Sequence, residues 1–178
     1  FSGTAKRAEG YPNSLMGVIA VIRQTVFDAR YYYAMQTWHK AHPADARPEY
    51  NPSLEALRPV LAKAGQQRIV IESGSVLMLN RAQVLAAELG FKPILVATGQ
   101  EWRRPQLMKQ IKAPFIVPVV FPAIPELPEE DDWNQVSLDQ LRGWDWAPEI
   151  PAMLQRDHAI AFTTHGLSDR KVFRKNIA

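Results

Sequence analysis

Apolar residues near the start of the chain recur every three or four positions. They are Leu15, Val18, Ile19, Ile22, Val26 and Ala29. This spacing predicts a long amphipathic helix that runs to about Trp38. Asn13 or Ser14 is expected to cap its N-terminus, because side-chain oxygens at that position accept hydrogen bonds from free backbone N–H groups.

The residues around this helix follow other patterns. Residues 1–12 are mostly polar and irregular, and we expect them to form a tail. The stretch from His42 to Pro52 has three prolines and no periodicity, which predicts a loop. A second helix is expected from about Ser53 to Ala64, ended by Gly65. The region 13–64 is therefore predicted to be helical.

From residue 65 onward, short apolar runs alternate with helical patterns. The predicted strands are 68–72, 93–98, 115–120 and 159–164. The predicted helices are 75–89, 101–113, a stretch from Ser137 that Pro148 and Pro151 break in two, and 169–178. An acidic, proline-rich loop, PAIPELPEEDDW, precedes Ser137. Strands this apolar, separated by helices, indicate a parallel sheet covered on its faces.

The predicted fold class is α/β, with parallel βα units forming part of a TIM-type (β/α)8 barrel. Four strands are about half of such a barrel, and two helices precede them. We expect one partial domain over 1–178, made of the tail, the helical region and βα units over 65–178. An open four-stranded parallel sheet would leave two edges unpaired. The chain is therefore expected to be a fragment of a longer protein, or a half-barrel that pairs with another.

Composition excludes several functional classes. The chain has 178 residues, 47% of them hydrophobic and 22% charged, which is typical of a soluble globular protein. No apolar run approaches the roughly 20 residues that span a membrane, and no targeting signal is recognisable. The absence of cysteine rules out disulfides, thiolate catalysis and cysteine-based zinc sites. It is compatible with either an oxidising or a reducing compartment.

The charge distribution gives little support for a nucleic-acid partner. The net charge is +3, and the clearest basic cluster is Arg170, Lys171, Arg174 and Lys175. These side chains share one face of the predicted terminal helix, where a solvated face is the simpler interpretation. There is no aromatic interleaving and no recognised binding motif, so we expect no nucleic acid to bind.

Two residues at the ends of predicted strands are candidates for catalysis or metal binding. Glu72 ends the first predicted strand, and as a general base it would act where barrel enzymes hold catalytic groups. Alternatively, it caps the helix that begins near Ser75. His165 follows the fourth strand and could bind a metal or relay a proton, or simply lie in the turn before Gly166. A zinc site needs at least three converging protein ligands, and Glu72 is the one second ligand that the sequence suggests.

Other residues are better explained structurally. Asp169 is expected to complement the dipole of the last helix, and Gly74 and Gly99 to form tight turns after strands. Trp133, Trp144 and Trp146 flank the acidic loop, where they could line a substrate mouth, but core packing is the commoner role of large aromatic side chains.

Several stretches together resemble the amidohydrolase superfamily. They are GYPNSLMGVIAVIRQTVFDARYY, IVIESGS, KPILVATGQEW, PFIVPVVFP, WDWAPEIPAMLQRDHAIAFTTHGLSD and FRKNIA. The resemblance covers nearly the whole chain from Tyr11 and is greatest to a divergent bacterial branch of imidazolonepropionase-related proteins. It implies a (β/α)8 barrel with zinc or another divalent metal at the strand ends and a substrate with amide or cyclic amide bonds. The compartment stays open, and both the bacterial cytoplasm and the periplasm are compatible with the sequence.

The resemblance also implies where metal ligands would lie. The strands here would be the fifth to the eighth, so the half with the His-x-His pair is outside this chain. The fifth-strand histidine position holds Glu72 or Ser73, the sixth-strand position holds Thr98 or a neighbour, and the eighth-strand aspartate position holds His165. Glu72 and His165 are therefore the candidate catalytic and metal-binding residues.

The sequence is compatible with three functions. The first is a metal-dependent amidohydrolase fragment whose activity requires the rest of the parent barrel or a second copy. The second is a catalytically degenerate segment that serves as a binding or interaction module, which the missing ligand histidines favour. The third is a free-standing three-layer α/β domain that binds a phosphorylated small molecule at its strand ends.

Overall fold

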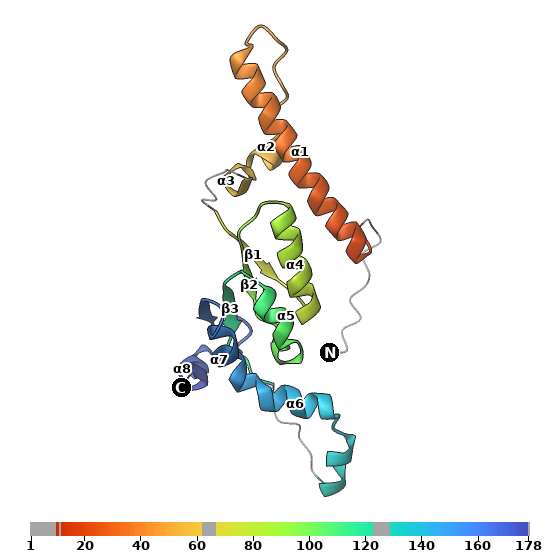
Figure 1. Ribbon diagram of the computed structural model, residues 1–178, viewed down its shortest axis with the longest axis vertical. Coiled ribbons are helices and arrows are strands. Elements are labelled where there is room, and N and C mark those ends of the chain that lie inside the picture. The colour runs from red at the N-terminus through yellow and green to blue at the C-terminus, as the bar shows by residue number, and fades with distance from the viewer. Residues whose placement is uncertain (1–9, 11, 62–66, 123–128, 178) are drawn as a thin grey trace. The chain divides into compact units, whose positions relative to one another are not determined.

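The computed structural model describes residues 10, 12–61, 67–122 and 129–177 (Figure 1). The chain divides into two compact units. The first consists of Phe1–Arg68 with Ala87–Phe91, and the second of Ile69–Ala86 with Lys92–Ala178. None of the described helices combines the length and apolar character that crossing a bilayer requires.

The first unit is built on the long helix α1, Leu15–Ala41. The Ser14 hydroxyl accepts a hydrogen bond from the Gly17 N–H at 3.1 Å, which confirms the predicted cap. In place of one helix over 53–64, the structure has two short helices, α2 (Pro52–Glu55) and α3 (Arg58–Leu61). Pro59 explains the break, because proline is tolerated in the first turn of a helix but not in its interior. The predicted end at Gly65 lies outside the described residues.

Polar side chains of α1 hold the rest of this unit in place. Arg23 forms a bidentate ion pair with Glu88, with N–O distances of 2.6 and 2.5 Å. Arg30 Nη2 donates to the Leu89 carbonyl at 2.7 Å. The Tyr33 hydroxyl donates to the Leu54 carbonyl. One long helix is thereby joined to two segments that are distant in sequence.

The second unit contains a four-stranded sheet. The strands are β1 (Ile69–Glu72), β2 (Pro93–Val96), β3 (Phe115–Pro118) and β4 (Ile160–Thr163). All neighbouring pairs are parallel, and the spatial order is β1-β2-β3-β4. This order of consecutive parallel strands confirms the predicted fold class, part of a TIM-type barrel.

Helices connect the strands. They are α4 (Val76–Glu88), α5 (Pro105–Gln110), α6 (Leu138–Trp146) and α7 (Ile150–Gln155), and α8 (Phe173–Ile177) follows the last strand. Short 3-10 helices are η1 (Glu101–Arg103), η2 (Glu130–Gln135), η3 (Ala147–Glu149) and η4 (Arg170–Val172). The predicted helix 101–113 is interrupted because Pro105 begins α5. Pro148 and Pro151 lie in the first turns of η3 and α7 and divide the stretch from Ser137, as predicted.

The two faces of the sheet differ in burial. On one face, Leu95, Phe115 and Val117 are buried in a core formed with side chains of α4, α5 and α7. Strand residues alternate between faces, so Val70, Ile94, Val96, Ile116 and Ala161 lie on the other. Of these, Val96 is buried, Ile94 and Ile116 are half-buried, and Val70 and Ala161 on the edge strands are exposed. The first face is therefore better covered than the second, which is called the open face below, whereas the sequence predicted cover on both.

Candidate functional site

Glu72 and His165 lie together at the carboxyl end of the sheet. Glu72 is the last residue of β1, and His165 follows β4 by two residues, so they come from opposite edges of the sheet. His165 Nε2 lies 3.5 Å from Glu72 Oε1. The two residues selected from the sequence as catalytic and metal-binding candidates are thus neighbours in the structure.

The turn after β4 fixes the backbone at His165. The His165 N–H donates to the Thr163 hydroxyl at 3.1 Å. Gly166 follows with φ at +81°, a left-handed conformation that L-residues with side chains rarely adopt. A Cβ added to Gly166 would lie 3.2 Å from Val120 Cγ2. A glycine is therefore required where the chain reverses direction after the histidine.

Both side chains of the pair are mostly exposed to solvent. The side chain of His165 is 63% exposed and that of Glu72 is 67% exposed. Their separation is longer than an ordinary hydrogen bond, and an exposed ion pair stabilises a fold by only about 0–1 kcal/mol. In the described residues, the cap of α4 is the Ser75 hydroxyl, which accepts from the Met78 N–H at 3.4 Å. Glu72 faces His165, and no hydrogen bond joins it to the described part of that helix.

A buried carboxylate that sequence reasoning missed follows the next strand. Glu101, in η1 after β2, has no exposed surface. Its Oε1 accepts hydrogen bonds from the Thr98 N–H at 2.6 Å and the Thr98 hydroxyl at 3.0 Å. Its Oε2 is buried without a hydrogen-bond partner among the described residues. The available signal was the Thr98-x-x-Glu101 spacing, which resembles a helix-capping arrangement.

Other predicted roles have mixed outcomes. Asp169 caps η4, with Oδ1 accepting from the Lys171 N–H at 2.9 Å, so its structural role is confirmed. Trp133, Trp144 and Trp146 were expected in a core, but they are between 43% and 51% exposed. That expectation was wrong because all three lie in the connection between β3 and β4, in η2 and α6, where neighbouring side chains leave about half of each tryptophan exposed.

The described residues do not by themselves form a catalytic metal site. No three His, Cys, Asp or Glu side chains in this part of the chain converge as metal ligands. Catalytic zinc sites use three protein ligands and keep a fourth position open. Glu72 and His165 would provide two, and Thr98 is engaged with Glu101. A metal held here would need donors from outside these residues.

Comparisons with known proteins support the fold. No protein-family model matches the chain, and no curated protein matches its sequence. A solved structure, an amidohydrolase from Thermotoga maritima MSB8, is similar with a TM-score of 0.65 and 18% sequence identity. The similarity covers 93% of this chain and 39% of the solved chain, so this chain spans less than half the length of that protein. In its fold, the chain resembles part of an amidohydrolase barrel.

Proposed function

We propose that this chain is the C-terminal half of an amidohydrolase-type barrel and contributes Glu72 and His165 to the hydrolysis of amide or cyclic amide bonds. The observation that carries the proposal is the 3.5 Å approach of the two side chains at the carboxyl edge of a parallel sheet. Barrel enzymes hold their catalytic groups at that edge. The imidazolonepropionase-related branch is the finer assignment that we propose, on the sequence resemblance.

With no metal on the pair itself, the two side chains are suited to moving a proton; with donors from further strands they would instead hold zinc, which would polarise the attacking water. His165 presents Nε2 to Glu72, which leaves Nδ1 as its second ring nitrogen. An imidazole oriented by a carboxylate accepts a proton from water while the water oxygen bonds to the amide carbon. The same proton then passes to the departing nitrogen as the C–N bond breaks. The products are an acid and an amine, and Glu72 stabilises the imidazolium that forms in between.

The open face of the sheet supports a partner that completes the barrel. The edge strands β1 and β4 each have one neighbour among the described strands, and Val70 and Ala161 on the open face are exposed. Eight strands close a barrel of this type, so four more parallel strands would cover this face and pair both edges. We infer that they come from the rest of a longer protein or from a second copy. Further ligands for zinc or another divalent metal would come from the same strands.

A catalytically degenerate module is the second candidate. The observation that favours it is the presence of only two converging donor side chains among the described residues. In the family pattern implied by the resemblance, Thr98 stands at a histidine position and His165 at an aspartate position. Such a barrel would bind a ligand or a protein partner without hydrolysing it.

Zinc titration followed by NMR distinguishes the two candidates. We would record the ring signals of His165 and His42 while zinc is added to the 178-residue chain. His42 is exposed in the first unit and serves as an internal control. The hydrolase proposal predicts that zinc shifts the His165 signals at concentrations that leave His42 unchanged. It also predicts that Glu72→Gln weakens this response at least tenfold, because one of two donors is lost. If His165 and His42 respond alike, the metal-binding role of the pair fails for this chain and the degenerate module is favoured.

A further inference from the structure

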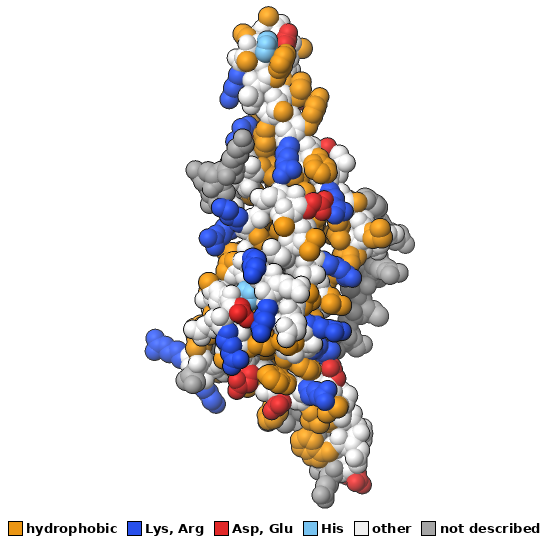
Figure 2. Space-filling model, viewed as in Figure 1, with side chains coloured by type: hydrophobic (Ala, Val, Ile, Leu, Met, Phe, Trp, Pro, Cys, Tyr) orange, Lys and Arg blue, Asp and Glu red, His pale blue; other side chains and the backbone are white. Residues whose placement is uncertain are grey.

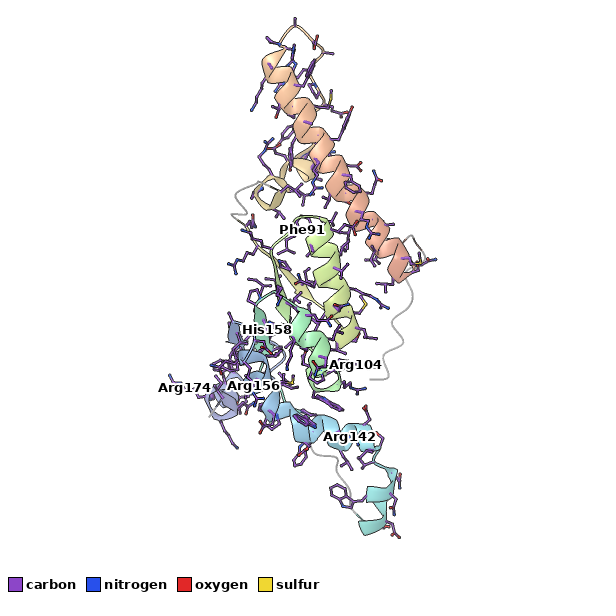
Figure 3. The ribbon with its side chains drawn as sticks, viewed as in Figure 1. Phe91, Arg104, Arg142, Arg156, His158 and Arg174 are labelled. Atoms are coloured by element: carbon purple, nitrogen blue, oxygen red, sulfur yellow. The ribbon has the colours of Figure 1, made fainter. Side chains whose placement is uncertain are left out.

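The segment between β3 and β4 is strongly acidic. Residues 129–149, here called the acidic segment, contain seven carboxylates and one cation, Arg142, which gives a net charge of −6 (Figure 3). The chain as a whole carries +3, so the remaining residues carry +9. This separation of charge creates an attraction for cationic surfaces that acts over a Debye length.

The acidic segment also exposes large aromatic side chains. Trp133, Trp144 and Trp146 are three of the five tryptophans in the chain, and each is about half exposed. Leu138, at the start of α6, is exposed beside them in sequence. Figure 2 shows hydrophobic side chains over the part of the molecule where α6 lies in Figure 1. Tryptophan is enriched among the residues that dominate binding energy at protein interfaces.

An arginine of this chain already binds to α6. Arg103 Nη2 lies 2.5 Å from Asp139 Oδ2, and the Arg103 guanidinium lies 5.1 Å from the centre of the Trp102 ring. Carboxylates and tryptophan faces both attract guanidinium groups. The contact illustrates how an arginine from another molecule would be held by the remaining acidic and aromatic side chains of the segment.

The same chain has a basic surface that could supply such cationic side chains. Arg170, Lys171, Arg174 and Lys175 lie on η4 and α8 and are exposed; we call them the basic segment (Arg174 is labelled in Figure 3). No described side chain forms an ion pair with them. Asn176 Nδ2 donates to the Val119 carbonyl at 2.8 Å, which attaches α8 to the end of β3. The basic segment is therefore held on a folded element.

We propose that two copies of the chain associate through these surfaces, with the acidic segment of each copy bound to the basic segment of the other. In a two-fold symmetric dimer this contact occurs twice, so both surfaces of both copies are used. The opposite charges accelerate and orient the encounter, and the tryptophans supply apolar area at the contact. This contact is distinct from the open face of the sheet and does not depend on the proposed hydrolysis.

Reciprocal charge reversal tests the proposal. One variant combines Arg170→Glu, Arg174→Glu and Lys175→Glu; the other combines Asp131→Lys, Asp145→Lys and Glu149→Lys. None of these six side chains forms a hydrogen bond or ion pair with the described residues, so the fold should tolerate both sets, and circular dichroism verifies it. Sedimentation velocity then measures the mass of each variant alone and of an equimolar mixture.

The expected results are specific to this contact. The unmodified chain should dimerise at about 50 mM salt, and its dissociation constant should rise at least tenfold at about 500 mM salt, since salt screens the charges. Each variant alone should associate at least tenfold more weakly than the unmodified chain. The mixture should form a heterodimer, because one contact then joins an unmodified acidic segment to an unmodified basic segment, and in the other the three new lysines face the three new glutamates. A monomeric unmodified chain, a dimer that salt and both variants leave unchanged, or a mixture that stays monomeric would each overturn the proposal. An unchanged dimer would point instead to the open sheet face.

Discussion

His165 lies 3.5 Å from Glu72 although the two residues follow strands at opposite edges of the sheet. The backbones of β1 and β4 would be about 14 Å apart in a flat sheet, at about 4.8 Å for each step between strands. A side-chain contact over that span is expected where the carboxyl edge of the sheet curls. Curling is also what closes a sheet into a barrel. The site and the partial-barrel architecture are thus two aspects of the same geometry.

The first prediction is that this pair contributes little to stability. Glu72→Gln and His165→Ala should each change the free energy of unfolding by less than about 1 kcal/mol, because both side chains are mostly exposed and water screens their attraction. Urea unfolding at neutral pH measures the change. A loss above about 2 kcal/mol for either variant would show that the pair has a structural role, and would weaken its interpretation as a functional site.

Glu101 should behave in the opposite way. In Glu101→Ala the Thr98 N–H loses its acceptor and a buried space is left, so the chain should lose about 2–4 kcal/mol of stability. Glu101→Gln keeps an acceptor oxygen for Thr98 and should lose less. Urea unfolding of both variants tests this order, and equal losses would mean that the charge of the carboxylate, and neither the side-chain volume nor an acceptor oxygen for Thr98, determines the cost.

The sequence predicted the architecture better than the site. Four apolar runs predicted four parallel strands because burial of a strand leaves a strong local signal. Glu72 and His165 were recognised separately as residues at strand ends, but their proximity depends on how the sheet curls, which no local pattern records. Glu101 was missed because a charged residue is ordinarily exposed. Its burial depends on the turn that Thr98 forms with it.

The helix lengths and the exposure of the tryptophans were also predicted incorrectly from the sequence. The helices expected over 53–64 and 101–113 are each divided, since a proline in the apolar pattern begins a new helix instead of continuing the first. Trp133, Trp144 and Trp146 were expected in a core on the basis of their size. Whether a large aromatic side chain is covered depends on the elements around it, and the connection between β3 and β4 that carries these three residues leaves them half exposed.

Tyr33 should make the stability of the first unit depend on pH in the alkaline range. Burial raises the pKa of the Tyr33 hydroxyl above its ordinary value of 10.0, and the charge of Glu55 raises it further. The stability from neutral Tyr33 is therefore complete below about pH 10 and is lost as the pH rises through the folded-state pKa. Tyr33→Phe removes the hydrogen bond to the Leu54 carbonyl, so its free energy of unfolding at neutral pH should be about 1 kcal/mol lower than that of the unmodified chain. Between neutral and high pH, the free energy of unfolding should fall less in this variant than in the unmodified chain. Thermal unfolding between neutral and alkaline pH measures both effects, and parallel pH curves for the two proteins would contradict the assignment to Tyr33.

The last prediction concerns three glycines that follow strands. Gly166 has φ at +81° and Val120 Cγ2 near the position of an added Cβ, whereas Gly99 has φ at +80° and open space around it. Gly74 has neither a positive φ nor a neighbour within 4 Å. Gly99→Ala should therefore lose about 1–2 kcal/mol from backbone strain alone, and Gly166→Ala at least as much, because Val120 must also move.

Gly74→Ala is the matched control, and it should be neutral or stabilise the chain by up to about 1 kcal/mol by restricting the unfolded state. Urea unfolding of the three variants gives the order of stability. Gly166→Ala should also displace the backbone next to His165, so the NMR signals of the His165 ring should shift in this variant and stay in place in Gly74→Ala. An unchanged His165 signal together with a loss of stability in Gly166→Ala would mean that strain at the turn is absorbed without reaching the histidine, and that Thr163 alone holds the backbone of His165 in position.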